Sequence, residues 1–196
     1  MTSKPLKVIA FNGSPRKQNN TGLLIGEIFK VLESEGIQTE MIQIGGTKIR
    51  GCQGCDKCRQ LKNNTCSMTR DPMNDWIAKA IDADAIILGS PTYFTDVTAE
   101  MKAFIDRLGY VSGANGGFLK RKIGAAVVAV RRGGGTHVFD TINHLFLIAG
   151  MIIAGATYWN LGVGRNYGEV LNDAEGIRNM TALGENIAWL LKKIHH

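Results

Sequence analysis

Short apolar runs alternate with amphipathic stretches along most of the chain. Five runs have the character of strands in a buried parallel sheet. They cover residues 6–11, 37–44, 85–88, 123–130 and a part of 151–160. Polar residues interrupt only the second run, which is therefore expected at or near an edge of the sheet. Elsewhere apolar residues recur at spacings of three and four, as on the buried side of a helix. The pattern predicts an α/β fold.

Five helices are expected between and after these strands. Their apolar stripes begin at Leu24, Met73, Met101, Val138 and Ile177. Strands that alternate with helices predict right-handed crossovers and a parallel sheet covered by helices on both faces. No repeat or linker divides the sequence, so residues 1–196 are expected to form one domain.

Local signals refine this picture at three places. The pair Asp71-Pro72 predicts a helix start, with aspartate as the N-cap and proline in the first helical position. Residues 109–119 are rich in glycine and are expected to connect a helix to the fourth strand. Residues 45–70 show neither a strand-like apolar run nor the apolar spacing of a helix. They are expected to form a long irregular segment, in which all four cysteines lie.

The loop after the first strand has the features of an anion site. Residues 12–22 lead from a buried strand into a helix N-terminus, where free backbone N–H groups and the helix dipole favour negative charge. Short polar side chains and one cation are added there by Ser14, Arg16, Asn19, Asn20 and Thr21. This loop is expected to bind a phosphate.

Two further glycine-bearing loops follow the third and fourth strands, at residues 89–94 and 131–136. Ligands of such sheets bind beyond the carboxyl ends of the strands, so the three loops are expected to converge on one ligand. The first loop lacks both the G-x-G-x-x-G of dinucleotide sites and the G-x-x-x-x-G-K-[ST] of P-loop NTPases. A terminal monophosphate, as in FMN, fits it better.

Composition and charge limit the classes of partner that are expected. Hydrophobic residues make up 44% and charged residues 20%, as in an ordinary globular protein. The net charge of +6 comes from scattered basic residues, so a nucleic-acid partner is not expected. The longest apolar run, residues 145–156, is too short to span a bilayer. The first residues show no apolar secretory segment, and a cytoplasmic protein without membrane contact is expected.

The four cysteines form a compact motif, C-x2-C-x2-C-x7-C. They are Cys52, Cys55, Cys58 and Cys66. The first three have the spacing of cluster-binding cysteines in ferredoxins. Three interpretations are open: a [4Fe–4S] cluster, which is favoured, a structural zinc ion, or cysteines that bind no metal.

Three motifs in this order resemble the flavodoxin-like NADPH-dependent FMN reductase family. They are residues 13–21, residues 90–94 and residues 101–107. The cysteine segment resembles that of the iron–sulfur flavoprotein branch, including its wider final gap. The resemblance implies a flavodoxin-like three-layer sandwich, with a five-stranded parallel sheet in the order 2-1-3-4-5 and helices on both faces.

The resemblance also implies a cofactor site, residue by residue. The FMN phosphate would be held by Ser14, Arg16, Asn20 and Thr21. The isoalloxazine ring would lie along Pro91, Thr92, Tyr93 and Phe94, and its other side would be closed by Gly133, Gly134 and Gly135. A cluster would be held by the four cysteines, and no side chain is expected to act as a covalent catalyst.

Three functional hypotheses follow. The first is an electron-transfer flavoprotein with FMN and one [4Fe–4S] cluster, in which the cluster reaches a flavin across a subunit interface of a homodimer or homotetramer. The second is an NAD(P)H-dependent FMN or quinone reductase without a cluster. The third is a non-catalytic flavin- or zinc-binding interaction protein. Ferredoxin and NAD(P)H are the electron donors considered.

Overall fold

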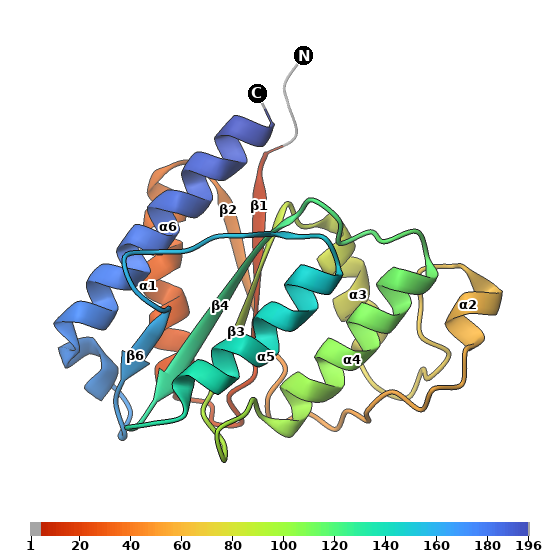
Figure 1. Cartoon of the computed structure of the whole chain (residues 1–196), viewed down its shortest axis with the longest axis horizontal. Helices are drawn as coiled ribbons and strands as arrows, with labels where there is room; N and C mark the ends of the chain where they lie inside the picture. The colour runs from red at the N-terminus through yellow and green to blue at the C-terminus, as the bar shows by residue number, and fades with distance from the viewer. Residues whose placement is uncertain (1–4, 196) are drawn as a thin grey trace.

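A parallel sheet runs through the centre of the protein, whose computed structural model describes residues 5–195 (Figure 1). The strands are β1 (Lys7–Asn12), β2 (Gln38–Gln43), β3 (Ala85–Pro91), β4 (Ile123–Val130), β5 (Ile152–Ile153) and β6 (Leu161–Val163). Their order is β2-β1-β3-β4-β5, and β6 also pairs with β4. All pairs are parallel. The predicted α/β class and strand order are confirmed.

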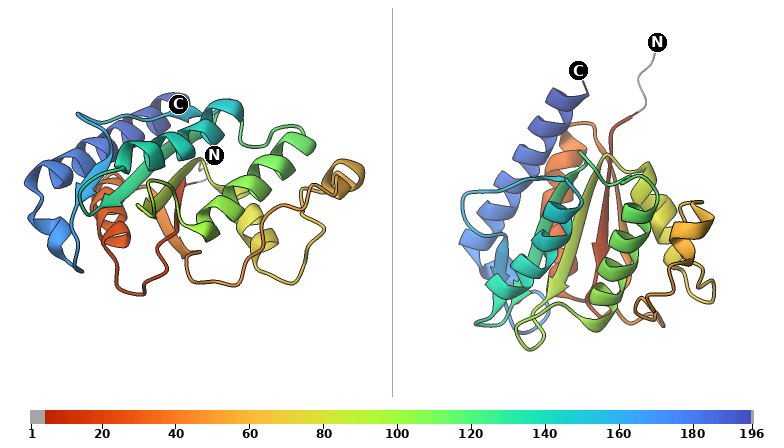
Figure 2. Two further views of the ribbon diagram at one scale, coloured as in Figure 1. Left: turned by 60° about the horizontal axis from the view of Figure 1, so that its bottom comes forward. Right: turned by 45° about the vertical axis from the view of Figure 1, so that its right-hand side comes forward.

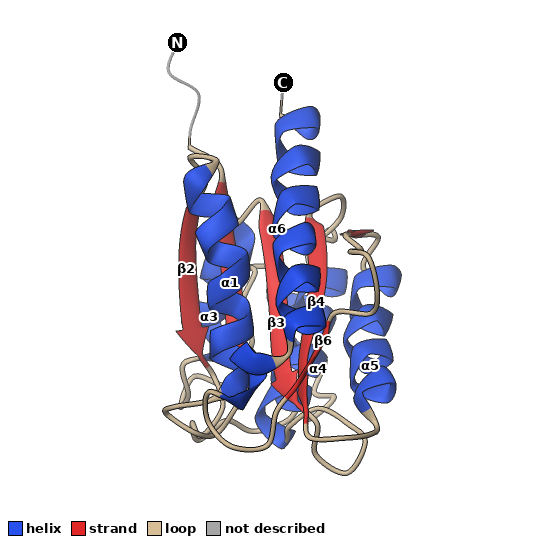
Figure 3. Cartoon of the chain, turned by 90° about the vertical axis from the view of Figure 1, so that its left-hand side faces the viewer, coloured by secondary structure: helices blue, strands red, loops and turns tan. Residues whose placement is uncertain are grey.

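Helices cover both faces of this sheet (Figure 3). One face carries α1 (Asn20–Ser34) and α6 (Ala174–Ile194), and the other carries α3 (Met73–Asp82), α4 (Ala99–Ala114) and α5 (Gly135–Ile148). Alternate residues of β1 serve the two faces: Val8 and Ala10 pack toward α1 and α6, whereas Ile9 and Phe11 pack toward the other three helices. Two short helices, α2 (Lys57–Leu61) and η1 (Glu169–Asn172), lie in connecting segments.

The fifth strand differs from the prediction. It is expected within residues 151–160, but only the two residues of β5 lie there, and β6 begins just beyond this range. The chain leaves the sheet between them and exposes the neighbouring rings of Tyr158 and Trp159. Because both pieces pair with β4, they share the outer position that one longer strand would occupy.

The glycine-rich connection also begins later than predicted, because α4 continues to Ala114. Gly109 lies inside this helix, where an added Cβ atom would come within 2.8 Å of the Leu145 side chain of α5. This glycine therefore serves close packing between two helices rather than a turn.

The start of α3 lies one residue later than predicted, with Pro72 in the capping position. Asp71 still accepts a hydrogen bond from the Met73 N–H at 3.3 Å. Its second carboxylate oxygen binds Arg107 of α4 at 2.5 Å. Among residues 5–195, no helix is long and apolar enough to cross a bilayer.

Candidate functional site

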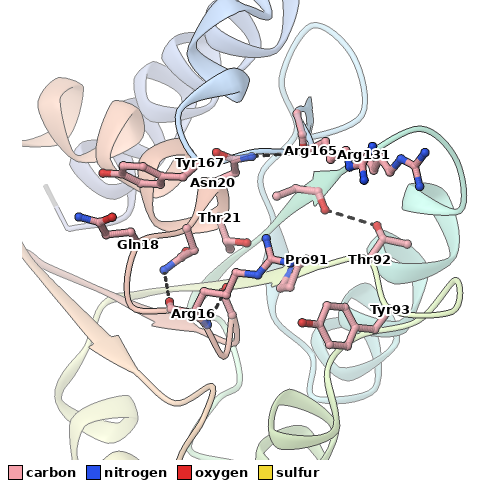
Figure 4. Close-up of a pocket in the computed structure, with 14 residues that line it drawn as sticks. Arg16, Gln18, Asn20, Thr21, Pro91, Thr92, Tyr93, Arg131, Arg165 and Tyr167 are labelled. Carbon is pink, nitrogen blue, oxygen red and sulfur yellow. Dashed lines mark hydrogen bonds between the residues drawn. The ribbon is translucent and has the colours of Figure 1, made fainter.

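A pocket of about 300 Å³ opens at the carboxyl edge of the sheet, among the segments that follow β1, β3, β4 and β6 (Figure 4). It brings together seven of the predicted cofactor residues: Ser14, Arg16, Asn20, Thr21, Pro91, Thr92 and Tyr93. Four other predicted residues do not line it: Phe94, Gly133, Gly134 and Gly135. The convergence expected from the sequence is thus present, although the third loop reaches the pocket through Arg131 and not through its glycines.

Two asparagines hold the first loop in shape. Asn19 caps α1, because its side-chain oxygen accepts a hydrogen bond from the Gly22 N–H at 2.6 Å. The same oxygen accepts one from the Asn12 amide at 3.1 Å, and the Asn12 oxygen accepts one from the Ser14 N–H at 3.0 Å. The Asn19 amide donates to the Arg16 carbonyl at 2.8 Å, so Asn19 fixes the loop rather than offering a free donor to a ligand.

Thr21 presents an unpaired hydroxyl at the start of α1. Its side chain is 1% exposed, and its Oγ1 has no hydrogen-bond partner within the described residues. Buried polar atoms in folded proteins are almost always paired, so this atom points to a ligand. Its position in the first helical turn, where the helix dipole favours negative charge, fits a phosphate oxygen.

Asn20 lines the pocket, but its side chain is engaged elsewhere. Its amide donates to the Gly164 and Asn166 carbonyls at 3.2 and 2.9 Å. Its oxygen accepts a hydrogen bond from the Gly168 N–H at 2.9 Å. Asn20 therefore anchors the segment after β6 to α1 and places the wall of the pocket.

The loop after β3 forms a tight two-residue turn. Backbone N–H groups of Tyr93 and Asp96 donate to each other's carbonyls at 2.9 and 3.0 Å. The turn residues Phe94 and Thr95 have positive φ angles of 48° and 65°. The Phe94 side chain is fully exposed at the tip, whereas Tyr93 lines the pocket.

Replacing Phe94-Thr95 with Asn-Gly should raise the free energy of unfolding by at least about 1 kcal/mol, because these residues adopt positive φ angles with less strain. Urea unfolding measures the change. Phe94→Ala is the control, since it removes the exposed ring but leaves a residue other than glycine or asparagine at the positive φ angle. It should alter the free energy of unfolding by less than about 0.5 kcal/mol. Equal or lower stability of the Asn-Gly variant would contradict the strain.

The glycine loop after β4 lies against the turn after β3, and its glycines do not line the pocket. Gly134 has a φ of 81°, and a Cβ atom there would come within 2.7 Å of the Thr95 methyl group. Gly135 is buried and opens α5, and Gly133 is exposed. The contribution of this loop to the pocket comes instead from Arg131.

Further lining residues come from the segment after β6, and sequence reasoning missed them. They are Gly164, Arg165 and Tyr167. This segment follows the strand whose position the sequence pattern predicted wrongly. It has no periodic pattern of its own from which a site could have been predicted. Arg165 and Arg131 are exposed beside the pocket, as is Arg16 on the first loop, so cations surround it on several sides.

The cysteine segment forms a second site beside α4. All four cysteines line one small cavity of about 20 Å³, together with residues of α4 that include Arg107 and Tyr110. The thiols are free; Cys52 and Cys55 are exposed, whereas Cys58 and Cys66 are buried. Across the described part of the chain, no three Cys, His, Asp or Glu side chains group closely enough to hold a single metal ion.

The backbone of Cys66 is held at both its N–H and its carbonyl by Asn74 of α3. Its N–H donates to the side-chain oxygen of Asn74 at 2.8 Å, and the Asn74 amide donates to the Cys66 carbonyl at 3.0 Å. No sequence pattern predicted that α3 would hold the fourth cysteine in this way. Cys58 is placed by α2, which the sequence pattern also did not predict.

The thiols differ in acidity. Burial raises the pKa of Cys58 above its usual value. The pKa of Cys55 is lowered, chiefly by a hydrogen bond with Ser67, whose Oγ lies 3.4 Å from the Cys55 sulfur. The exposed thiol is therefore the easier of the two to deprotonate, as metal binding requires.

Comparison with known proteins decides the family. A sequence model of the NADPH-dependent FMN reductase family matches residues 6–166. The chain belongs to this family. It is accordingly an FMN-dependent oxidoreductase with a flavodoxin-like fold.

Its relatives place this family member in the iron–sulfur flavoprotein branch. An iron–sulfur flavoprotein of Methanocaldococcus jannaschii is 36% identical over 201 residues, which cover 96% of this chain and 99% of the relative. One from Archaeoglobus fulgidus is 30% identical, with 95% of this chain and 98% of the relative covered. The recognition made from the sequence motifs is confirmed.

Solved structures share the fold. RosB, whose crystal structure holds 8-demethyl-8-formylriboflavin-5′-phosphate, aligns with a TM-score of 0.78 at 20% identity, over 96% of this chain and 80% of that one. A flavodoxin from the domain Archaea aligns with a TM-score of 0.61 at 18% identity, over 95% and 99% of the two chains.

Proposed function

We propose that this FMN reductase family member transfers electrons between an FMN in the pocket at the sheet edge and a [4Fe–4S] cluster held by Cys52, Cys55, Cys58 and Cys66. One observation carries the proposal: a single chain has both a phosphate-type pocket and a separate cavity lined by four thiols. FMN supplies two-electron chemistry and a cluster passes single electrons, so their combination splits or collects electron pairs.

The first loop holds the FMN phosphate in this proposal. Ser14, Thr21 and the N-terminus of α1 supply donors, and Arg16 supplies positive charge. Pro91, Thr92 and Tyr93 lie along the flat ring, where close backbone approach orients the cofactor. Asn20 anchors the segment after β6 instead of binding the phosphate, and Phe94 and residues 133–135 lie outside the lining of the pocket.

Thr21→Val should weaken FMN binding by about 10- to 150-fold, because a hydrogen bond to a charged group contributes about 1.5–3 kcal/mol. Quenching of FMN fluorescence on addition to FMN-free protein measures the dissociation constant. Thr181→Val is the matched control, since Thr181 lies on α6 and bonds the Ile177 carbonyl at 3.2 Å. Equal affinities of the two variants would place the phosphate elsewhere.

The thiol cavity suits a cluster by its chemistry. Four thiolates are the usual ligands of a [4Fe–4S] cube, and the motif spacing matches. The buried guanidinium of Arg107 at the cavity adds positive charge that offsets such a group. The free volume of the cavity is only about 20 Å³. The exposed loop with Cys52 and Cys55 therefore has to move outward to admit a cluster.

The two sites lie at different ends of the molecule. The pocket sits between α1 and the segment after β6, whereas α2 and the cysteine segment lie beyond α4 on the opposite side (Figure 2). We therefore propose that the protein works as a homodimer or homotetramer, in which the cluster of one chain faces the flavin of another. NAD(P)H and ferredoxin are the proposed electron donors.

Protein purified without oxygen tests this function. A visible spectrum with flavin maxima and a broad violet shoulder, together with bound iron and sulfide, is expected. Flavin alone with rapid NAD(P)H oxidation would favour the second candidate, a reductase without a cluster, which the exposure of Cys52 and Cys55 supports. A colourless protein that carries zinc would exclude both.

A further inference from the structure

One buried arginine connects the cysteine segment to the body of the protein. Arg107 of α4 is 0% exposed and is the largest fully buried side chain among the described residues. One terminal nitrogen donates to the Asp71 carboxylate at 2.5 Å and to the Arg50 carbonyl at 3.2 Å. The other donates to the Met68 carbonyl at 3.0 Å. Since residues 50 and 68 flank the four cysteines, one guanidinium ties both ends of their segment to α4.

This guanidinium places a buried positive charge at the thiol cavity. Arg107 Nε is buried without a hydrogen bond within residues 5–195. Arg107 lines the same cavity as the four cysteines. Burial lowers the pKa of Arg107, but Asp71 and the neighbouring Cys66 sulfur outweigh burial and raise it. A buried guanidinium that lines a cavity of thiols can donate a charge-assisted hydrogen bond to a thiolate there.

We infer that Arg107 is a positioning residue for the cluster site: it fixes the ends of the cysteine segment, donates from its guanidinium toward the Cys66 sulfur, and raises the reduction potential of the bound group. This inference rests on the proposed function. Reduction adds negative charge to the cluster, and a buried cation close by favours the more negative form. A hydrogen bond to a ligand sulfur acts in the same direction.

Asp71 does not cancel this effect. Asp71 pairs with a terminal nitrogen of Arg107 and is absent from the cavity lining, whereas Arg107 itself lines the cavity. The Asp71 carboxylate therefore does not face the cavity, whereas the guanidinium does. The carboxylate keeps the arginine in place, and the arginine is the nearer charge to the cluster.

The test is an EPR-monitored redox titration of protein purified without oxygen. Arg107→Gln removes the charge, and the double variant Arg107→Met with Asp71→Asn removes the pair without leaving a buried charge unpaired. The matched control is Arg59→Met, because Arg59 lies on α2 within the cysteine segment, where its side chain is 59% exposed and water screens its charge. Both variants at Arg107 should show a cluster potential below that of wild type, and the control should shift it much less.

The sign of the shift in reduction potential distinguishes an electrostatic effect of Arg107 on the cluster from a mere loosening of the cysteine segment. If the variants only loosen the segment, entering water stabilises the more negative reduced cluster and the potential rises. An unchanged or higher potential in the double variant would overturn the inference, and so would an equal shift in the Arg59 control. A wild-type protein that binds no iron would instead refute the proposed function on which the inference rests.

Discussion

Protein with Cys55→Ala should lose most of its iron and the broad violet absorbance but retain FMN. Thiolates hold iron–sulfur clusters, so removing one of four ligands removes a bond that no nearby side chain replaces. The FMN pocket and the thiol cavity share no lining residue, which is why the flavin should stay bound. Iron and FMN analysis of protein purified without oxygen, together with its visible spectrum, checks this.

Ser67→Ala is the matched control for this substitution. It removes the hydroxyl that lies 3.4 Å from the Cys55 sulfur but leaves all four thiols in place. The control should keep its iron. Loss of FMN with retention of iron in Cys55→Ala would show that the two sites are not separate.

Asp71→Asn should lower the free energy of unfolding at pH 7 by about 3 kcal/mol, because it leaves the buried charge of Arg107 without its partner. The Asp71 side chain is 8% exposed and that of Arg107 is 0% exposed. Burial alone would raise the pKa of Asp71, but the hydrogen bond and charge of Arg107 outweigh it and lower the pKa. The carboxylate form is therefore the one that the folded state favours.

The pH dependence of this effect has a definite sign. A lowered folded-state pKa stabilises the protein above the unfolded value of about 3.9, and this stability is lost as the pH falls through the folded value. Urea unfolding of wild type and Asp71→Asn should thus differ most near neutral pH, and the difference should begin to shrink only below about pH 4. Asp106→Asn, in an exposed pair with Lys102, should cost less than about 0.5 kcal/mol. A pH-independent difference between wild type and Asp71→Asn would contradict the ion pair.

Much of the fold could be predicted because β1, β3 and β4 are almost wholly apolar and buried on both faces. The sheet edge could not, because β5 and β6 are two and three residues long and lack a recognisable period. Gly109 misled for a physical reason: a glycine that permits close helix packing looks the same in sequence as one that makes a turn.

The candidate site was predictable where a loop directly follows a strong strand. Ser14 and Thr21 follow β1, and Pro91 ends β3, so the sequence pattern carried them to the pocket. Arg165 and Tyr167 follow the weak strand β6, and no local signal marked them. The partners of Asn20 and Arg107 lie far away in sequence, so their anchoring roles become visible only once the chain is folded.

An anaerobic reductive titration, followed by visible absorption and EPR, tests the central claim most directly. FMN and one [4Fe–4S] cluster in each chain should together take up about three electrons per chain, two at the flavin and one at the cluster. The EPR signal of a reduced cluster should appear during this titration. Uptake of about two electrons with bleaching of the flavin and no cluster signal would contradict the account.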